Sequence, residues 1–167
     1  MKVLKLVVCL VLFSHLSCKK QPQTNNLFSE NKYQASEINN GSDQVYKNIE
    51  IAKKSFEAFN KHDWQEQANY FSDSCSYLDP SYGDSPVVKS RKEKIEKYSK
   101  MEQMSPDITD SITSIFGVKN KVIVQFTSSG TAKTEQGYYK WSLPICCIFT
   151  FKDGLIVKDE TYYNRGK

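Results

Sequence analysis

Two aspartates have the side-chain type and the setting that acid–base chemistry needs. Asp79 precedes Pro80 at the end of a short segment typical of a strand, and Asp159 lies in the last such segment of the chain. A carboxyl group whose pKa is raised by apolar neighbours can accept or release a proton near neutral pH. An Asp before a proline is also a common turn residue, because its side chain can bond the following backbone. Asp79 and Asp159 are therefore candidate catalytic residues, with a structural turn as the alternative for Asp79.

The N-terminus has the pattern of an export signal. Residues 1–17 begin with two lysines, continue with an apolar run from Leu6 to Phe13 and end in small and polar residues. The run is too short to span a bilayer core, which needs about 20 residues. We expect residues 1–17 to be a signal peptide.

Cys18 follows this segment directly. With the preceding Leu16-Ser17 it resembles the lipobox of bacterial lipoproteins, and His15 stands where that pattern has an aliphatic residue. The resemblance implies cleavage before Cys18, acylation of its thiol by a fatty acid such as palmitate, and a membrane anchor in the bacterial cell envelope. Anchoring becomes stable once more than one chain is attached. The alternatives are an ordinary secreted protein cut nearby and a buried cysteine in an N-terminal helix.

Loss of the signal would leave few residues for metal or nucleophilic chemistry. His62 would be the single remaining histidine, which argues against a histidine-dependent triad or a multi-histidine metal site. Three cysteines would remain beyond Cys18, and they allow at most one disulfide. Since adjacent strand residues point to opposite faces, Cys75 could pair with either Cys146 or Cys147. We expect no metal and no cofactor.

The composition limits the classes of function. The chain has 167 residues, of which 39% are hydrophobic, and a formal net charge of +4. These values exclude wholesale disorder and a multi-span membrane protein. Half of the net charge comes from Lys2 and Lys5 in the signal, and the remainder is too small to predict a nucleic-acid partner.

The rest of the chain divides into a tether and one domain. Residues 18–43 are rich in Asn, Gln, Ser and charged side chains and lack a sustained apolar period. Such a segment cannot bury enough apolar surface to offset its loss of conformational entropy, so we expect a flexible tether. The domain then covers residues 44–167.

Two helices are predicted at the start of the domain. The first begins near Gln44 behind an Asp43 cap, and its inward stripe consists of Tyr46, Ile49, Ala52, Phe56 and Phe59. The second covers residues 64–71 after an Asp63 cap.

A third helix is predicted from Ser90 to about Met104. Ser90 and Glu93 have the spacing of a capping box. The residues expected to face inward are Ile95, Tyr98 and either Met101 or Met104. Glutamates are interleaved with its basic residues, which favours a solvated face over a binding patch for Arg91, Lys92, Lys94, Lys97 and Lys100.

Strands account for most of the remainder. Residues 75–79 form a short strand before a loop over residues 80–89. After Pro106 the pattern alternates, with Ile108, Ile112 and Phe116 on one face of the first strand and Val122, Val124 and Phe126 in the second. A long strand over residues 137–151, bent at Pro144, is joined through Asp153-Gly154 to a last strand over residues 155–164. The order predicts an α+β fold with helices on one face of a curved, mostly antiparallel sheet.

The domain resembles the SnoaL-like and ketosteroid isomerase branch of the nuclear transport factor 2-like superfamily. The similar segments are FEAFNKHDWQEQANYFSDSCSYLDP and CCIFTFKDGLIVKDETYYN, with a helix between them. They contain an Asn-x-x-Asp turn, an Asp-Pro at the end of the first strand and an aromatic hairpin with Asp-Gly at its tip. The resemblance implies a cone-shaped, cystatin-like fold with a cavity between helices and sheet, and it leaves function open.

The resemblance also places the groups of the isomerases. Their general base falls on Asp79, their phenolic donor on Ser55 and their second, protonated acid on Cys147. Ser55 and Cys147 are poor substitutes for those donors, and stabilising a dienolate requires strong ones. We therefore reject steroid isomerase activity.

Strand alternation within this fold suggests which residues face the cavity. Tyr77 shares a face with Asp79, Cys147 shares one with Phe149, and Asp159 shares one with Tyr163. We take Tyr77, Cys147, Phe149 and Tyr163 as candidate ligand-binding residues. The aromatic cluster of Tyr138, Tyr139 and Trp141 is expected in the core or on a homodimer surface, with a ligand platform as the alternative.

Three functions are consistent with these expectations. The first is a non-catalytic, membrane-tethered domain that binds a small apolar ligand or a partner protein. The second is an isomerase, cyclase or dehydratase that uses Asp79 or Asp159. The third is a structural homodimer with a closed core and an apolar outer sheet face.

Overall fold

The computed structural model describes residues 35–164. The predicted signal peptide, Cys18 and most of the predicted tether lie outside this range. Three helices and six strands make up the described domain: α1 (Ala35–Asn60), α2 (Trp64–Asn69), β1 (Phe71–Leu78), β2 (Val87–Lys89), α3 (Arg91–Met104), β3 (Thr109–Val118), β4 (Lys121–Thr134), β5 (Gly137–Lys152) and β6 (Leu155–Tyr162).

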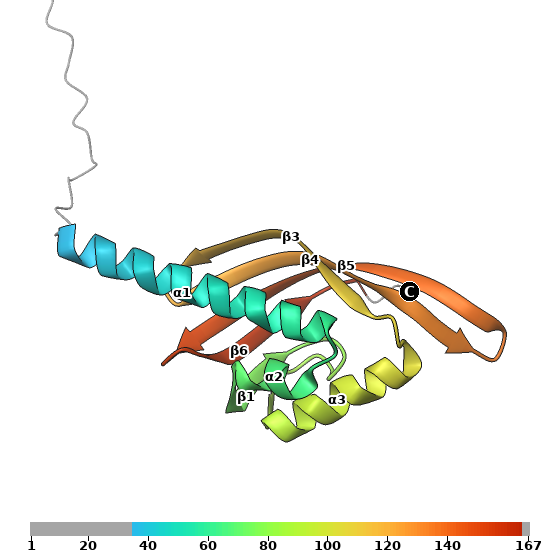
Figure 1. Cartoon of the computed structure of the whole chain (residues 1–167). Helices are drawn as coiled ribbons and strands as arrows, with labels where there is room; N and C mark the ends of the chain where they lie inside the picture. Colours follow the sequence, from blue (N-terminus) through green and yellow to red (C-terminus); the bar gives the residue numbers. More distant parts are fainter. Residues whose placement is uncertain (1–34, 165–167) are drawn as a thin grey trace, which may run out of the picture. The chain divides into compact units, whose positions relative to one another are not determined.

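The six strands form one sheet in the order β2-β1-β6-β5-β4-β3. Every neighbouring pair is antiparallel except β1 and β6, which run parallel. The three helices gather on one face of this curled sheet (Figure 1). The predicted α+β fold with a curved, mostly antiparallel sheet is confirmed.

Helix α1 is longer than predicted and rotated slightly relative to the expected stripe. It begins at Ala35 rather than behind Asp43, so residues 35–43 of the predicted tether are helical. Tyr46, predicted to face inward, is 68% exposed. The inward contact is made by Val45 and Ile49, at the point where α1 crosses Gly117 of β3: a Cβ on Gly117 would lie 2.7 Å from Val45 Cγ1.

The predicted caps of the other two helices are confirmed. Asp63 accepts a hydrogen bond of 2.9 Å from the Glu66 amide at the start of α2. At the start of α3 the Ser90 hydroxyl accepts from the Glu93 amide at 3.2 Å, and the Glu93 carboxylate accepts from the Ser90 amide at 2.9 Å. This capping box fixes where α3 begins and hence which of its side chains face the sheet.

Two predicted element boundaries near the first strand were wrong. Strand β1 begins at Phe71, four positions before the predicted start, and the end of the predicted second helix becomes strand. The predicted loop over residues 80–89 contains β2, which pairs Val87 with Tyr77.

A bulge in β3 changes the face that its side chains occupy. Ile112 pairs with Phe126 and Ser114 pairs with Gln125, so Thr113 is an extra residue in the strand. Inward positions are even-numbered before the bulge and odd-numbered after it. Phe116, predicted to share a face with Ile112, is consequently 51% exposed.

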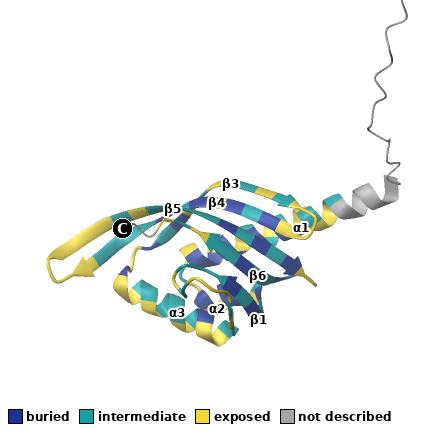
Figure 2. Cartoon of the chain, turned by 180° about the vertical axis from the view of Figure 1, so that it is seen from behind, coloured by how far each residue is buried: buried dark blue, intermediate teal, exposed yellow. Residues whose placement is uncertain are grey.

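The long strands end in two hairpins of different character. Asp153 and Gly154 have positive φ values of 52° and 77°, as the tight turn between β5 and β6 requires. The β4–β5 hairpin extends beyond the helices, and its tip is solvent-exposed (Figure 2). Tyr138 and Tyr139 lie on this tip and are 79% and 62% exposed, so neither is in the core of the described domain.

The apolar core lies between the helices and the sheet. Its main cluster joins Phe56 of α1, Phe71 and Tyr77 of β1, and Phe149 and Phe151 of β5. A second, smaller cluster joins Phe59, Trp64 and Ile108. Among the described helices, none combines the length and the hydropathy needed to cross a bilayer.

Candidate functional site

A cavity opens between the helices and the inner face of the sheet. It encloses about 840 Å³ of empty space, including the part open to solvent at its mouth. Most of its wall is apolar and comes from α1, β1, α3, β4 and β5: Phe56, Phe59, Phe71, Met101, Phe126, Trp141, Leu143, Ile145, Cys147 and Phe149. A cavity with this mainly apolar lining suits a small organic molecule.

The structure brings most of the predicted site residues to this cavity. Asp79, Asp159, Cys147, Phe149 and Tyr163 all line it. The pairing of Phe149 with Asp159 and of Cys147 with Thr161 across β5 and β6 places them on one wall.

Tyr77 is the predicted ligand-binding residue that does not line the cavity. It is 3% exposed and stacks on Phe71, with ring centroids 6.3 Å apart. Its other side contacts the Tyr82 ring. Tyr77 therefore belongs to the core beneath the cavity wall.

Asp79 is held by a dense set of donors. Its Oδ2 lies 2.7 Å from Lys97 Nζ, and its Oδ1 accepts from the Ser81 amide at 2.8 Å and from the Tyr163 hydroxyl at 3.3 Å. Burial favours the neutral acid, but the Lys97 ammonium and the hydrogen bonds outweigh it and hold the pKa of Asp79 below its usual value. Asp79 is therefore a fixed carboxylate, which is a poor general base near neutral pH.

Asp159 has a different environment at the same end of the cavity. It is buried on β6 and accepts a hydrogen bond of 2.7 Å from the Thr161 hydroxyl. Burial raises the pKa of Asp159, and the charge of Lys94 opposes that rise. A proton can therefore reside on Asp159 at a higher pH than on an ordinary aspartate.

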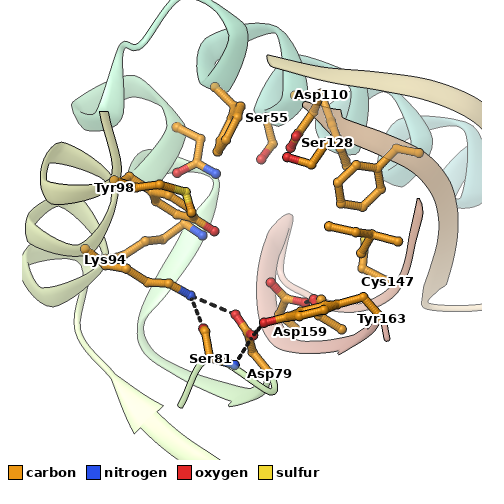
Figure 3. Close-up of a pocket in the computed structure, with 18 of the residues that line it drawn as sticks. Ser55, Asp79, Ser81, Lys94, Tyr98, Asp110, Ser128, Cys147, Asp159 and Tyr163 are labelled. Carbon is orange, nitrogen blue, oxygen red and sulfur yellow. Dashed lines mark hydrogen bonds and ion pairs between the residues drawn. The ribbon is translucent and has the colours of Figure 1, made fainter. Parts of the chain in front are cut away.

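Lys94 was predicted to lie on a solvated helix face, and this was wrong. The residue is 1% exposed and lines the cavity. Its Nζ lies 3.6 Å from the centroid of the Phe71 ring and 4.7 Å from that of Tyr98 (Figure 3). Burial lowers the pKa of the Lys94 amine to about 8, and the charge of Asp159 opposes that fall.

Lys97 also departs from the predicted solvated face. Besides its ion pair with Asp79, its Nζ donates to the Ser81 hydroxyl at 2.8 Å and lies 4.1 Å from the centroid of the Tyr82 ring. Lys92 and Lys100 are exposed, as predicted.

A second cluster of polar side chains lies at the end of the cavity opposite Asp79 and Asp159. Figure 3 shows Asp110, Ser128 and Ser55 together there, across the cavity from Asp79 and Asp159. Asp110 Oδ1 and Gln67 Oε1 are buried without a hydrogen-bond partner among the described residues. Burial raises the pKa of Asp110 to about 7, although a hydrogen bond with Ser128 acts in the opposite direction.

The position of Asp110 is set by the turn that follows α1. The Asn60 side chain accepts from the Asp110 amide at 2.7 Å and donates to its carbonyl oxygen at 2.9 Å. His62, in the same turn, contacts the Ile108 carbonyl oxygen at 2.9 Å. The Asn-x-x-Asp turn therefore has two roles: Asp63 caps α2, and Asn60 fixes the backbone of β3 beside the cavity.

Sequence reasoning missed Lys94, Asp110 and Ser128. A signal existed for all three. Lys94 lies one helical turn before Tyr98, on the stripe predicted to face inward, and Ser128 continues the alternation of Val124 and Phe126. Asp110 lies between the inward positions Ile108 and Ile112 and could have been found in the same way.

The described residues hold no cluster suited to a metal ion. Within residues 35–164, no three His, Cys, Asp or Glu side chains converge on one point. Cys75, Cys146 and Cys147 are free thiols, so neither of the possible disulfides with Cys75 is formed.

The family of the chain follows from its sequence match. Residues 52–158 match the SnoaL-like domain family, and the chain belongs to that family. None of the curated proteins matches the sequence.

Solved structures share the fold at low sequence identity. A protein with a ketosteroid isomerase-like fold from Catenulispora acidiphila, in complex with trimethylamine, is 16% identical, with 70% of this chain and 86% of that chain covered and a TM-score of 0.61. An LEH-like epoxide hydrolase from M. tuberculosis is 15% identical, with 72% and 85% covered and a TM-score of 0.61. An uncharacterized cystatin-fold protein from Novosphingobium aromaticivorans is 15% identical, with 69% and 97% covered and a TM-score of 0.61. These likenesses show the fold.

Proposed function

We propose that this SnoaL-like domain binds a small, mainly apolar molecule in its cavity, with polar groups of the ligand at the two ends. The observation that carries the proposal is the pair of buried oxygens at the wall, Asp110 Oδ1 and Gln67 Oε1, that lack a partner among the described residues. Leaving a buried acceptor unpaired costs about 1–3 kcal/mol, and a ligand donor would recover part of that cost. The apolar wall between the two polar ends supplies the area for hydrophobic binding.

A thermal-shift screen of the full chain against hydrophobic metabolites tests the proposal. We expect compounds with an apolar body and a hydroxyl or carbonyl group to raise the melting temperature in a concentration-dependent way. Absence of any shift across the screen, together with absence of any captured partner, would contradict it.

A second candidate function is acid–base catalysis of an isomerisation, cyclisation or dehydration. It is favoured by the two carboxyl groups at opposite ends of the cavity, Asp110 and Asp159, whose pKa values burial raises. Groups with such shifts in a cavity are typical of acids and bases in catalysis. Asp79 does not serve this role, because Lys97 holds it as a carboxylate. Steroid isomerase activity is not proposed, since Ser55 and Cys147 line the cavity where strong donors would be needed.

The test for catalysis is proton exchange. Ligands found in the screen would be incubated with the chain in deuterated buffer and followed by NMR. We expect deuterium at carbon positions next to a carbonyl, and loss of this exchange in Asp110→Asn or Asp159→Asn. A ligand that binds and acquires no deuterium would support binding without chemistry.

We also propose that the chain is exported and anchored in the bacterial cell envelope through an acyl group on Cys18. The support is the sequence of the first 18 residues. Metabolic labelling with radioactive palmitate should mark the wild type and leave Cys18→Ser unmarked. Absence of label on the wild type would refute the proposed acyl anchor. Homodimer formation stays a prediction, which light scattering of the purified chain at micromolar concentration addresses.

A further inference from the structure

Lys94 presents a buried primary amine to the cavity. Its capped helix places it on the inner face of α3, where its side chain is 1% exposed and lines the cavity. Its Nζ lies over aromatic rings, with the Phe71 and Tyr98 centroids at 3.6 and 4.7 Å. In the described part of the chain, the contacts of the Lys94 amine are with the rings of Phe71, Tyr77 and Tyr98.

The other cationic group of the site is not available in this way. Lys97 Nζ is bound to Asp79 at 2.7 Å and to Ser81 at 2.8 Å. These two contacts direct the Lys97 amine toward Asp79 and Ser81 and away from a ligand. The two lysines, three residues apart on one helix, therefore differ in chemistry: one closes an ion pair, and the other faces the ligand space.

The groups that face Lys94 are an acid and several aromatic rings. Asp159 of β6 is the acidic group that acts on its charge most, Lys97 of α3 is the basic one, and Cys75 and Asp79 of β1 contribute less. Burial lowers the pKa of Lys94 to about 8 and raises that of Asp159. An amine with a pKa near 8 has roughly two orders of magnitude more neutral form at pH 7 than an exposed lysine. The Lys94 amine is therefore neutral more often than that of an exposed lysine, and Asp159 holds a proton at a higher pH than an ordinary aspartate.

We propose that Lys94 binds aldehydes or ketones covalently, through a Schiff base between its Nζ and the carbonyl carbon of an apolar ligand in the cavity. This names the ligand class of the binding site proposed above and rests on that proposal. Desolvated lysines in apolar pockets are the ones that act as nucleophiles toward carbonyl carbon.

The covalent step uses the Lys94 amine, the Asp159 acid and the ligand carbonyl, and needs no other reactant. The electron pair of neutral Lys94 Nζ attacks the carbonyl carbon, and the carbonyl oxygen becomes a hydroxyl after proton transfer from the attacking nitrogen. The neutral Asp159 acid then protonates this hydroxyl, which leaves as water while the nitrogen electron pair completes the C=N bond. The products are an iminium ion, an Asp159 carboxylate and one water molecule, so no oxidant or reductant is involved. The iminium ion carries the positive charge that the Lys94 ammonium carried, and the charge of Asp159 acts on it in the same way.

The rest of the cavity selects the ligand. An aliphatic or aromatic chain on the carbonyl carbon would lie against Phe56 and Phe149, which line the apolar wall. At the far end Asp110 offers a partner for a hydroxyl or amide group. Carbonyl compounds with an apolar chain therefore fit better than small polar aldehydes.

Reductive trapping tests the inference. The full chain would be treated with hexanal and sodium cyanoborohydride, which reduces an imine to a stable amine, and the modified peptides would be mapped by mass spectrometry. We expect Lys94 to gain one hexyl group at least about tenfold faster than the exposed Lys92 and Lys100 of the same helix, in line with its larger neutral fraction. Glycolaldehyde lacks the apolar chain and gains only from the neutral fraction of Lys94, so it should show a smaller preference for Lys94 than hexanal does.

Variants distinguish a specific Schiff base at Lys94 from non-specific modification of exposed lysines. Lys94→Met should lose the fast modification at position 94 and keep the slow modification of exposed lysines. Lys92→Met should keep the fast modification of Lys94 and the slow modification of Lys100. Asp159→Asn, which keeps the size of the side chain but cannot supply the proton, should slow trapping at Lys94 and leave Lys92 unchanged. The wild-type peptide map stands by itself if Lys94→Met does not fold.

The outcomes distinguish the two proposals. Trapping at exposed lysines with Lys94 unmodified overturns the Schiff base. If hexanal still quenches the fluorescence of Trp141, which lines the cavity, the proposed binding site is supported and only the covalent step is refuted. If it neither modifies Lys94 nor quenches Trp141, and no other apolar compound shifts the melting temperature, both proposals fail.

Discussion

Lys97 Nζ lies 2.7 Å from Asp79 Oδ2, and this ion pair closes one corner of the cavity. Both partners are largely buried, with 20% and 13% of their side chains exposed. The pair explains why an aspartate in the sequence position of a general base is held ionised, and it leaves Lys94 as the cation that faces the ligand space. Lys97 binds Asp79 and Lys94 faces the cavity, and this difference determines which reactions the site can support.

Breaking this ion pair should destabilise the domain. Lys97→Met leaves the buried Asp79 carboxylate without its cation, and we expect the free energy of unfolding at pH 7 to fall by about 1–3 kcal/mol. The exposed Lys100→Met on the same helix should change it by less than about 0.5 kcal/mol. Urea denaturation of the three proteins measures this.

The same comparison has a defined pH dependence. The folded-state pKa of Asp79 is lowered from 3.8, so its contribution to stability is present above that value and is lost as the pH falls through the folded-state pKa. The wild type and Lys97→Met should therefore converge in acid. A difference that persists at the lowest pH would show that Lys97 acts through packing and not through Asp79.

Asp110 should have the opposite pH dependence. Burial raises its folded-state pKa from 3.8 to about 7, so its stabilising effect is complete below the lower value and is lost as the pH rises toward the higher one. Asp110→Asn cannot ionise, and we expect it to be more stable than the wild type by about 1–3 kcal/mol at pH 8, with no gain at pH 4. Urea denaturation across this range gives the curves, and parallel curves for both proteins would refute the raised pKa.

Lys94 and Asp159 should be energetically coupled. The charge of Asp159 raises the pKa of Lys94 and the charge of Lys94 lowers that of Asp159, so the double variant should lose less stability than the sum of the single variants Lys94→Met and Asp159→Asn. We expect a coupling energy of about 1–3 kcal/mol at pH 7. Unfolding of the four proteins in urea completes the cycle. Additive effects would mean that the two side chains do not sense each other.

The thiols should differ in reactivity. Burial raises the pKa of Cys75 to about 11 and that of Cys147 well above its usual value, whereas Cys146 is partly exposed. Iodoacetamide at pH 8 should therefore label Cys146 first in the native chain, and all three equally in urea. Peptide mapping reads the order. Rapid native labelling of Cys75 would contradict the packing of β1.

The fold was predictable because its signals are local. The Ser90–Glu93 capping box, the Asp63 cap and the Asp153-Gly154 turn each fix a boundary through nearby backbone hydrogen bonds. The start of α1 was not predictable in this way, since the polar residues before Asp43 have no apolar period that would mark a helix.

The candidate site was only partly predictable, because long-range contacts decide its chemistry. Alternation placed Cys147, Phe149 and Asp159 on the cavity wall. The burial of Lys94 was not predicted, because basic and acidic residues alternate along α3 and this pattern indicates a solvent-exposed helix surface. Asp79 and Lys97 are 18 residues apart in sequence, and only the tertiary structure shows that the lysine holds the aspartate.

A cavity that admits an apolar ligand is the central feature of the proposed function, and two neighbouring cysteines allow it to be tested. Cys147 lines the cavity, while Cys146 faces the opposite side of the same strand. The measurement is a fluorescence titration of the full chain with the apolar dye N-phenyl-1-naphthylamine, for the wild type, Cys147→Leu and Cys146→Leu. We predict saturable binding to the wild type and to Cys146→Leu, and at least about tenfold weaker binding to Cys147→Leu, whose larger side chain fills the cavity. Equal binding to all three, or no saturable binding to the wild type, would contradict the account.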